Sequence, residues 1–569
     1  MSSEVRDQSY APTERKARGA FFTPPVLANY LAGWALHGNR SARVLDPTCG
    51  EGVFLLAAAR ELRKLGATEE SLNDQVCGVD LHEGSLAETS SLLEAEGLDA
   101  HVIAANFFEL PPPGELFPSI GPFDAVIGNP PFVRYQQHIG DARRASLQAA
   151  FRQGVRLSGL ASSWAALLIH AAAFLARDGR LAMVVPSELL TVGYAEPVRQ
   201  WLSRRFSAVK LVFFERRQFP DALENVLLLL AQGTGGCDAF SLYYTHDGED
   251  LKRIRPFDEY AVALAASGKW TDLMLSVPER HVFKALASKY FVGLDTYGSP
   301  ELGTVTGANS FFTLSEETRR AFGLIPDQHV IKTCPPGTRH LRGLKFTASD
   351  WKDLRDEGEA VWMLYPKADD SSDALNDYLA LGKERGVPQA YKCQVRSPWW
   401  RPPVVSTPDL FFTYMSHHYP RLITNTASVS FVNSMHGVRL LKDAPQIASE
   451  ALPVLAMNSV TMLGAEMYGR SYGGGILKME PREAARLPVP ASGHLRAAWE
   501  ILQPERDRLE RSLRCGEWPS VVERVDQVLL REVLKVAESD VVIVSTALHT
   551  LRRRRISREL TPIGPKARA

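Results

Sequence analysis

The residues best suited to chemistry follow an apolar run, where Phe123–Gly128 leads into the turn Asn129–Phe132. The two prolines of this turn fix φ and remove two backbone donors. The Asn129 side-chain oxygen and the Pro130 carbonyl can then accept both hydrogens of an exocyclic amino group, and Phe132 offers a face to the planar ring. A strand that ends in asparagine and proline is also an ordinary turn, so the surrounding motifs must decide between the two interpretations.

A glycine-bearing loop lies upstream, within Ala42–Leu55, between an apolar strand-like run and a helix-forming stretch. Gly50 and Gly52 would let the backbone approach a ligand closely, although their spacing is not that of a dinucleotide-binding loop. The carboxylate of Asp46, which opens the loop, suits a cationic partner. The loop therefore predicts a site for a nucleotide-like cofactor.

Two further strand-like runs end in polar residues. Val76–Leu81 carries Asp80 where a βαβ unit places a ribose-binding acid, although a carboxylate at this position could also cap the next helix. Ala100–Ala105 leads into Asn106–Phe108, whose amide and aromatic rings suit the edge and the face of an adenine. Both runs extend the predicted cofactor site.

Strands alternate with helical segments in the residues that follow. The pattern predicts a helix over Trp164–Leu175 and strands over Leu181–Pro186, Leu211–Phe214 and Val226–Ala231. This alternation favours a doubly wound, mostly parallel sheet, in which ligands bind beyond the carboxyl ends of the strands near the switch point. Every motif described above lies at such an end, so we expect the motifs to form one site.

The order of these motifs resembles that of the gamma-class N6-adenine DNA methyltransferases, which include Taq-type modification enzymes and single-chain restriction-modification enzymes. The resemblance implies a Rossmann-like domain that uses S-adenosylmethionine, and it adds two positions. Gly19–Pro25 is similar to the family's first cofactor motif, whose threonine, here Thr23, helps to seat the methionine part of the cofactor. Phe219 matches the aromatic residue that stacks on the flipped adenine opposite Phe132. The alternatives are a helix cap for Thr23 and a core position for Phe219.

The candidate site residues form two sets. The catalytic candidates are Asn129, Pro130, Pro131, Phe132 and Phe219. The cofactor candidates are Thr23, Asp46, Pro47, Cys49, Gly50, Gly52, Asp80, Leu81, Asn106 and Phe107. Asn106 departs from the family pattern, which more often has aspartate there, but its amide oxygen can still accept from the adenine 6-amino group.

The residue types in the turn indicate how methyl transfer would proceed. An adenine N6 lone pair is delocalised into the ring, and two hydrogen-bond acceptors would draw the amino group towards tetrahedral geometry as charge develops. Bound reactants held at near-attack distance then require neither a strong general base nor a covalent intermediate. A cytosine-C5 methyltransferase would instead need a cysteine nucleophile in a Pro-Cys turn, and none of the six cysteines has that setting. By resemblance, asparagine at 129 favours adenine over cytosine N4.

A chain of 569 residues is too long for one methyltransferase domain. We predict an α/β catalytic domain over 1–235, a mixed α+β target-recognition region over 236–490 and a helical, basic C-terminal tail over 491–569. The first boundary is placed at the flexible cluster Gln232–Gly236. After base flipping only one nucleotide lies in the catalytic pocket. The recognition region would therefore contact the neighbouring bases of double-stranded DNA.

Three stretches of the recognition region combine cations, aromatic residues and glycines. Gly303–Phe312 is similar to a motif that recurs in the C-terminal regions of related adenine methyltransferases, and Lys392–Arg401 and Tyr468–Lys478 suit phosphate contact and base stacking. The candidate DNA contacts are Asn309, Arg396, Trp399, Arg401, Arg470 and Lys478. The alternatives are a closed core edge for the tryptophans and a tight turn for the glycines. In the tail, Arg552–Arg555 suits a polyanion or a solvated helix face.

Composition constrains location and partners. The formal net charge is zero, which argues mildly against a chain that coats nucleic acid. The sequence shows no Cys-x-x-Cys pair, no histidine cluster at ligand spacing, no signal peptide and no apolar stretch long enough to span a bilayer. We expect a cytoplasmic protein with reduced thiols, no metal and no membrane contact. No nuclease motif is evident, so a cognate restriction endonuclease or other defence-system protein would be a separate chain.

The predicted function is site-specific methylation of adenine N6 in double-stranded DNA after base flipping, within a restriction-modification or related defence system. One alternative is a methyltransferase that acts on RNA or on a protein glutamine, because the same turn suits any planar amino group. The large C-terminal region and the motif at Thr23 weigh against it. The other alternative is a non-catalytic DNA-binding specificity component, against which the intact Asp46, Asp80 and Asn129–Phe132 count.

Overall fold

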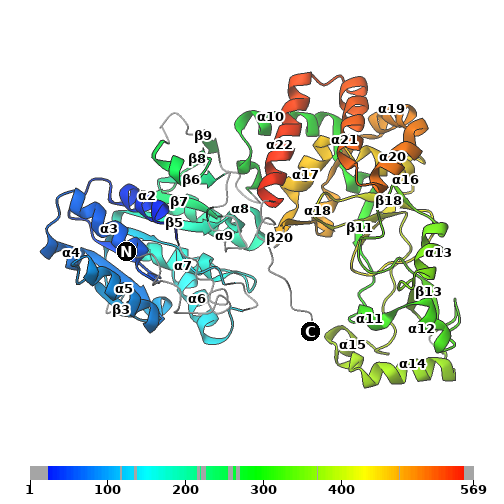
Figure 1. Cartoon of the computed structure of the whole chain (residues 1–569), viewed down its shortest axis with the longest axis horizontal. Coiled ribbons are helices and arrows are strands. Elements are labelled where there is room, and N and C mark those ends of the chain that lie inside the picture. Colours follow the sequence, from blue (N-terminus) through cyan, green and yellow to red (C-terminus); the bar gives the residue numbers. More distant parts are fainter. Residues whose placement is uncertain are drawn as a thin grey trace, which may run out of the picture. The chain divides into compact units, whose positions relative to one another are not determined.

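The chain divides into two compact units, Met1–Met274 with Ser557–Ala569, and Leu275–Ile556, in a computed structural model (Figure 1). Each unit is described by itself. The structure describes residues 23–115, 118, 120–133, 137–214, 218, 226–253, 260–263, 270–367, 369–472 and 475–556.

The first unit is built on a nine-stranded sheet of order β3-β2-β1-β4-β5-β7-β6-β8-β9. Its strands are β1 (Val44–Asp46), β2 (Val76–Asp80), β3 (His101–Ala104), β4 (Phe123–Gly128), β5 (Leu175–Pro186), β6 (Ala208–Phe214), β7 (Val226–Gln232), β8 (Ala239–Thr245) and β9 (Tyr260–Ala263). The first five strands pair in parallel, whereas β7 runs antiparallel between β5 and β6. The prediction of a mostly parallel α/β sheet is confirmed in this half of the sheet.

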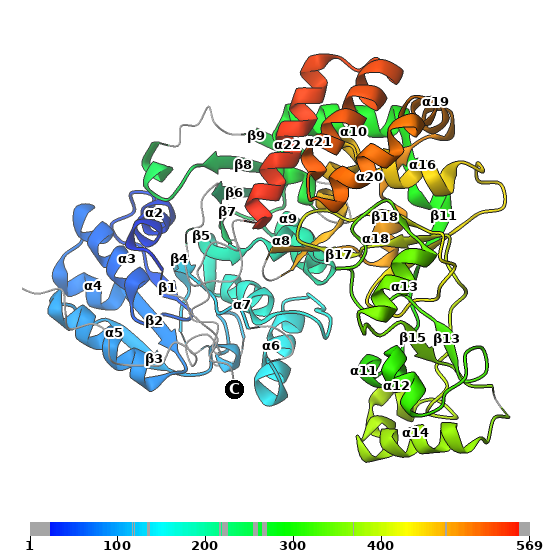
Figure 2. The same ribbon diagram turned by 45° about the vertical axis from the view of Figure 1, so that its right-hand side comes forward.

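Helices cover both faces of this sheet (Figure 2). They are α2 (Pro25–Leu36), α3 (Val53–Lys64), α4 (Glu69–Gln75), α5 (Glu83–Ala95), α6 (Gly140–Arg152), α7 (Ser163–Ala171), α8 (Glu188–Thr191) and α9 (Glu196–Arg205). Strand β4 shows why two cores form, because Ala125 and Ile127 pack with α2 and α3 while Val126 packs with α7 on the other face. All nine residues of α7 are buried, which fixes its start firmly behind β4.

The strand order reverses between β1 and β4, which are neighbours in the sheet although they lie far apart in the chain. Chains leave β1 and β4 at the same edge and turn to opposite faces, so the crevice for a ligand lies at this point. The loop that begins at Asp46 and the turn that begins at Asn129 both start here. The fold therefore brings the two predicted motifs to one place.

The second unit is a mixed α+β structure with a five-stranded sheet of order β11-β19-β16-β18-β14. Its strands are β10 (Phe291–Gly293), β11 (Gly298–Leu302), β12 (Thr313–Leu314), β13 (Val330–Lys332), β14 (Lys345–Phe346), β15 (Trp362–Leu364), β16 (Leu410–Phe412), β17 (Met415–Ser416), β18 (Leu422–Asn425), β19 (His436–Leu440), β20 (Arg470–Tyr472), β21 (Ile476–Lys478) and β22 (Pro488–Pro490). Strands β12, β15 and β13 form a second small sheet over the aromatic core around Trp351 and Trp362.

Helices complete the second unit. They are α10 (Val277–Tyr290), α11 (Asn309–Phe312), α12 (Glu316–Ala321), α13 (Ala348–Asp356), α14 (Asp373–Glu384), α15 (Tyr391–Gln394), α16 (Ala448–Leu455), α17 (Ser459–Tyr468), α18 (Pro481–Ala485), α19 (Ser492–Leu502), α20 (Arg506–Arg514), α21 (Trp518–Asp526) and α22 (Glu538–Ile556). Helix α22 packs against α17 and α10, and α19 packs against α16. The prediction of a mixed region that ends in helices is confirmed.

The unit boundary differs from the predicted one. It falls between Met274 and Leu275, because β8 and β9 continue the first sheet beyond the glycine cluster at 233–236. That cluster is a turn within the first unit. The helices after residue 490 likewise belong to the second unit instead of forming a separate tail, since α19 and α22 pack on earlier helices.

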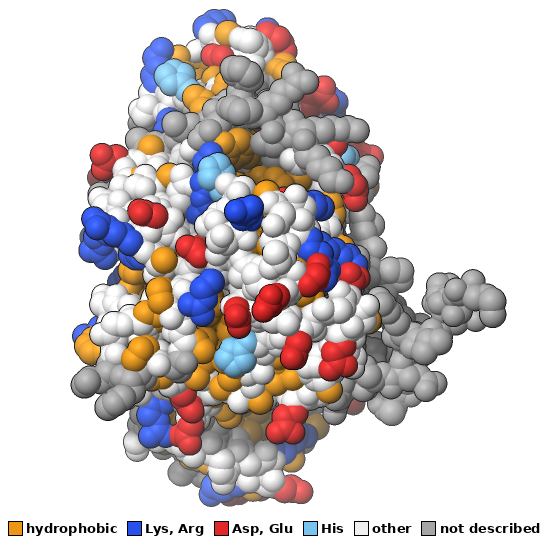
Figure 3. Space-filling view, turned by 90° about the vertical axis from the view of Figure 1, so that its left-hand side faces the viewer, with side chains coloured by type: hydrophobic (Ala, Val, Ile, Leu, Met, Phe, Trp, Pro, Cys, Tyr) orange, Lys and Arg blue, Asp and Glu red, His pale blue; other side chains and the backbone are white. Residues whose placement is uncertain are grey.

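The described residues of one face of the molecule carry acidic and basic side chains interspersed, with apolar side chains among them (Figure 3). Among the described residues of this face, the basic side chains are scattered and form no continuous stripe of the kind that binds nucleic acid. In the described part of the chain, no helix is long and apolar enough to cross a membrane. The same residues include no group of three or more side chains placed to hold a metal ion.

Candidate functional site

The catalytic turn and the glycine loop are in direct contact. Gly128, the last residue of β4, faces the loop so closely that a Cβ there would lie 2.8 Å from Asp46 Oδ1. A side chain at this position would force the Asp46 carboxylate to shift, so the close approach favours glycine. Asn129 and Asp46 are consequently held on adjacent strand ends.

The amide of Asn129 has one end engaged and one end without a partner. Its Nδ2 donates to Thr23 Oγ1 at 3.1 Å. Its Oδ1 is buried and has no hydrogen-bond partner in the described part of the chain. Because a buried acceptor without a donor is costly, an incoming N–H group would be stabilised there. Thr23 thus orients the amide so that its oxygen is the atom available to a ligand.

Asp46 is fully buried, and only one of its carboxylate oxygens is engaged. Oδ1 accepts from the Thr48 backbone N–H at 3.1 Å, whereas Oδ2 has no partner among the described residues. Burial raises the pKa of Asp46 to about 8, and the charge of Asp80 adds to that rise against the hydrogen bond from Thr48. A cation bound here would favour the ionised carboxylate.

The other predicted loop positions form a cradle of backbone groups. Asp80 accepts from the Gly50 N–H at 3.0 Å and from the His82 N–H at 2.9 Å. Gly50 and Gly52 both have positive φ, and Gly52 also lies against the Thr89 side chain. The loop is therefore tied to the end of β2, as a nucleotide-binding βαβ unit requires.

Two cofactor candidates have contrasting environments. The Leu81 side chain is 71% exposed directly after Asp80, so an apolar surface is presented beside the predicted ribose position. The Cys49 thiol is buried, and burial together with the charges of Asp46 and Asp80 raises its pKa far above the ordinary range. Cys49 is therefore a neutral packing residue and not a nucleophile.

The adenine-side prediction is corrected at Phe107. Its ring is only 3% exposed and packs 5.1 Å from the His170 ring and 4.9 Å from the Phe174 ring, so it is part of the core. Asn106 lies at the surface end of this turn, where its Oδ1 accepts from the Phe108 N–H and its Nδ2 donates to Glu109. A ligand at this position would have to share the amide with Glu109.

The aromatic pair predicted to enclose the flipped base is described only in part. Phe132 is partly buried and packs against both cores of the first unit. Phe219 lies outside the described residues, as do Gly19–Phe22 of the upstream motif. The prediction that Phe219 stacks on the base therefore stays a prediction.

The predicted DNA contacts Arg396 and Arg401 stay predictions, and both guanidinium groups have internal partners in this structure. Arg396 donates to the backbone carbonyls of Thr306 and Trp399 and lies 4.8 Å from the Phe312 ring centre. Arg401 donates to the Pro366 carbonyl and lies over the ring of a tyrosine. These cations fasten their turn to the rest of the unit.

The other four candidates also make intramolecular contacts. Asn309 donates to Asn433, and the Trp399 ring packs on Phe311 and Phe312 at the edge of the core. Arg470 pairs with Glu483, and Lys478 pairs with Glu480. Their role as DNA contacts stays a prediction, and each of them would have to exchange or share an internal partner to contact DNA.

The solvent side of the same turn exposes different residues. Tyr391, the first residue of α15, and Val395, which directly follows the helix, are 70% and 62% exposed. Lys392 is also exposed, with its ammonium 5.6 Å from the Tyr391 ring centre. Beneath them Cys393 is fully buried, and Gly307 lies against Lys392 Cβ. The segment 391–395 therefore exposes an aromatic residue, an aliphatic residue and a cation, and the buried Cys393 anchors it to the core.

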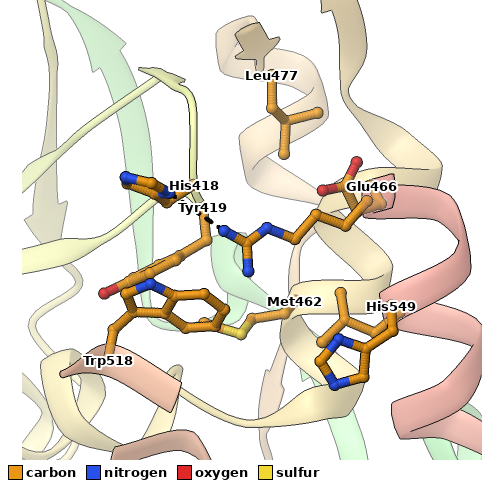
Figure 4. A pocket seen from close by; sticks show the side chains of 9 residues that line it. His418, Tyr419, Met462, Glu466, Leu477, Trp518 and His549 are labelled. Atoms are coloured by element: carbon orange, nitrogen blue, oxygen red, sulfur yellow. Dashed lines mark hydrogen bonds between the residues drawn. The ribbon is translucent and has the colours of Figure 1, made fainter. Parts of the chain in front are cut away.

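Two arginines of the run on α22 have internal partners. The Arg555 side chain is almost fully buried, pairs with Glu466 and donates to the His418 carbonyl. Arg552 lies 4.1 Å from the centre of the Trp518 ring and donates to His418 Nδ1. It is one of the residues that line a small pocket together with His418, Trp518 and His549 (Figure 4). These two arginines help to hold α22 in place, whereas Arg553 of the same run is exposed.

Sequence reasoning did not single out two positions that contact the candidate site, although a signal for each was present. Gly128 ends a strand, which often marks a close backbone approach. Ser163 opens the apolar helix α7, and a serine is typical of a helix start. Neither signal could predict the contact itself. Gly128 approaches Asp46 and Ser163 bonds to the turn at Pro131, and both partners lie far away in the chain.

Two family models match the chain. The model described as "N-6 DNA Methylase" matches residues 4–202, and the model described as "Type II methyltransferase M.Eco57I, C-terminal domain" matches residues 267–530. The first match contains the glycine loop and the catalytic turn, and the second contains most of the second unit. The first match thus lies within the first unit, and the second match lies almost wholly within the second unit.

Alignments with two similar proteins cover most of the chain. The "Type II methyltransferase M.AccI" of Acinetobacter calcoaceticus is 22% identical over 537 residues, which cover 92% of this chain and 95% of the relative. The "Type II methyltransferase M.XamI" of Xanthomonas campestris pv. amaranthicola is 25% identical over 500 residues, which cover 84% and 86%. These relatives have the same extent and the same order of parts as this chain.

A solved structure shares the fold. The type IIL restriction-modification enzyme MmeI in complex with DNA aligns with a TM-score of 0.56 and 13% sequence identity, covering 96% of this chain and 80% of that chain. At this identity the likeness concerns the fold alone. The motif order, the two family models and the two full-length relatives place this chain in the gamma-class N6-adenine DNA methyltransferases.

Proposed function

We propose that this chain transfers a methyl group from S-adenosylmethionine to adenine N6 at a specific site in double-stranded DNA, after flipping the base out of the duplex. The observation that carries the proposal is a pair of buried acceptors without partners among the described residues, Asn129 Oδ1 and Asp46 Oδ2, on adjacent strand ends. One acceptor suits an amino group and the other suits a cation, which are the reacting group and the charge type of the cofactor.

The residues present fit S-adenosylmethionine. The buried carboxylate of Asp46 suits a positively charged ligand, and Asp80 at the end of β2 suits ribose hydroxyls beside the exposed Leu81. Gly50 and Gly52 leave room for close approach of the ligand to the backbone. When bound, the cofactor supplies an electrophilic methyl group on a sulfonium.

The chain's own contribution is to hold the amino group and orient its lone pair. Asn129 Oδ1 accepts one amino hydrogen and the Pro130 carbonyl accepts the other, which draws the nitrogen towards tetrahedral geometry as charge develops. Thr23 keeps the Asn129 amide from rotating, because its hydroxyl engages Nδ2. Phe132 presents its face to the base from the partly buried end of the turn. Positioning of the two reactants then provides much of the rate enhancement.

The test of the proposed reaction is single-molecule sequencing of genomic DNA from a methylation-free host that expresses the chain. We expect N6-methyladenine at one recurring motif, and none in a host that expresses Asn129→Ala as the matched control. Unmodified DNA beside a folded, cofactor-binding protein would contradict the proposal. Transfer of labelled methyl groups to RNA or protein in the same cells would then support the alternative substrates.

Target recognition is assigned to the second unit, and within it to the exposed side of the turn at Tyr391. An exposed aromatic ring on a fixed base can stack on a base or fill a groove, and the adjacent Lys392 can contact a phosphate. We expect Tyr391→Ala to weaken binding of a labelled mixed-sequence duplex about 10-fold, the equivalent of about 1.4 kcal/mol. Lys392→Ala should reduce the salt slope of binding by about one.

Fluorescence anisotropy at a series of salt concentrations measures both effects. Val542→Ala is the matched control, because Val542 is another exposed apolar residue of the same unit, on α22. Unchanged affinity of Tyr391→Ala, equal to that of the control, would place DNA recognition on a different surface. A cognate endonuclease, in the restriction-modification setting that the family implies, is proposed as a separate chain.

A further inference from the structure

We propose that Ser163 is a positioning residue for the reaction, which holds the catalytic turn from behind and leaves the Pro130 carbonyl as the backbone acceptor for the substrate amino group. The inference rests on the proposed function, because it assigns a role relative to Asn129. Ser163 is the first residue of α7 and is 4% exposed, so it does not lie at the surface that a substrate would reach.

Three hydrogen bonds join Ser163 to the end of the turn. The Ser163 hydroxyl donates to the Pro131 carbonyl and accepts from the Val133 N–H at 3.0 Å. The Ser163 backbone N–H donates to the Val133 carbonyl at 3.0 Å. A single residue therefore engages both sides of the chain where it leaves the catalytic turn.

The turn depends on such support because its sequence removes the usual means of holding a backbone. Pro130 and Pro131 have no N–H, so neither can donate a hydrogen bond that would fix the turn. The Ser163 hydroxyl supplies the missing donor from another element. Of the two proline carbonyls, that of Pro131 is engaged by this donor, which assigns the substrate contact to that of Pro130.

The base on which Ser163 sits is itself fixed. Helix α7 is buried along its whole length. Next to Ser163, the Trp164 Nε1 donates to the Tyr194 hydroxyl at 3.1 Å, and that hydroxyl also contacts Glu188. Burial raises the pKa of Tyr194 far above its ordinary range, so the phenol stays protonated as a donor.

The turn is thus held at both ends by hydroxyl groups that lie outside it. Thr23 engages the amide of Asn129 at the start, and Ser163 engages the carbonyl of Pro131 near the end. Both hydroxyl-bearing residues are buried. Because a shift of about 1 Å can cost about 100-fold in rate, loss of either hydroxyl should act on turnover more than on binding.

The test compares Ser163→Ala with Ser162→Ala in the full-length protein, on a duplex that carries the motif found by sequencing. Ser162 is the matched control because it is an adjacent buried serine that contacts Tyr194 and not the turn. We expect Ser163→Ala to lower kcat about 10- to 100-fold with little change in the Kd for S-adenosylmethionine. Ser163→Thr, which keeps the hydroxyl, should recover most of kcat, and Ser162→Ala should change kcat less than threefold.

Circular dichroism melting and cofactor titration establish that each variant is folded and binds the cofactor. Equal kcat for Ser163→Ala and the wild type, or a Ser163→Thr variant that is folded yet as slow as Ser163→Ala, would overturn the inference alone. A wild-type protein that binds S-adenosylmethionine and methylates no DNA would overturn the proposed function, and the role of Ser163 in that reaction with it. The wild-type control therefore distinguishes the two failures.

Discussion

Asn129→Ala is expected to lower the rate of methyl transfer by about 1000-fold, because it removes the buried acceptor that stabilises charge developing on the amino group. The Kd for S-adenosylmethionine should change little, since the amide engages Thr23 and has no contact with the cofactor loop among the described hydrogen bonds. Single-turnover transfer of a labelled methyl group to duplex DNA measures the rate, and calorimetry measures the affinity.

Asn73→Ala is the control for this experiment. Asn73 is a partly buried asparagine of the same unit, and its Oδ1 accepts from the Asp99 N–H at 2.9 Å. Its replacement should leave methyl transfer unchanged. A rate for Asn129→Ala within tenfold of the wild type would contradict the assigned mechanism, because an ordinary turn asparagine would tolerate the change in the same way as Asn73.

The affinity for S-adenosylmethionine should rise with pH until about pH 8. The pKa of Asp46 is raised to about 8 by burial, so the carboxyl is mainly protonated below that pH. A cationic ligand binds best to the ionised carboxylate, and binding below pH 8 must therefore release a proton. Affinity should increase up to about 10-fold per pH unit below pH 8 and level off above it.

Asp46→Asn should remove this dependence and weaken binding most above pH 8, where the wild-type carboxylate is ionised. The variant also reports any titration of the ligand itself, which remains when the carboxyl is gone. Calorimetry in buffers of different ionisation enthalpy measures both the affinity and the proton released. Wild-type affinity that does not vary between pH 6 and pH 9 would show that Asp46 does not face the cation.

The strands and the catalytic turn could be predicted because their causes are local. Phe123–Gly128 is apolar on both faces and becomes β4, which contributes to two cores. Two consecutive prolines fix φ and lack an N–H whatever surrounds them, so the shape of the turn follows from its own sequence. The end of the first unit could not be predicted in this way, since the glycine cluster at 233–236 has the same composition whether the next strand starts a new unit or extends the sheet.

The DNA contacts show the limit of composition most directly. Arg396 and Tyr391 lie in the same cationic and aromatic stretch, yet the guanidinium turns inward to the Thr306 carbonyl and the tyrosine is exposed. Sequence reasoning selected the stretch but not the side of it that faces solvent. The direction of a side chain depends on carbonyls and rings brought near by the fold, and these lie about 90 residues away in the chain.

The sequence by itself determined the family, the order of the motifs and the identity of the acceptor in the turn, because each of these depends on residues that are close together in the chain. Only the tertiary structure decided what orients that acceptor. Thr23 lies 106 positions from Asn129, and Ser163 lies 32 positions from Pro131. Hydrogen bonds between such distant residues exist only after the helices and strands have packed, so no local pattern of residues could specify them.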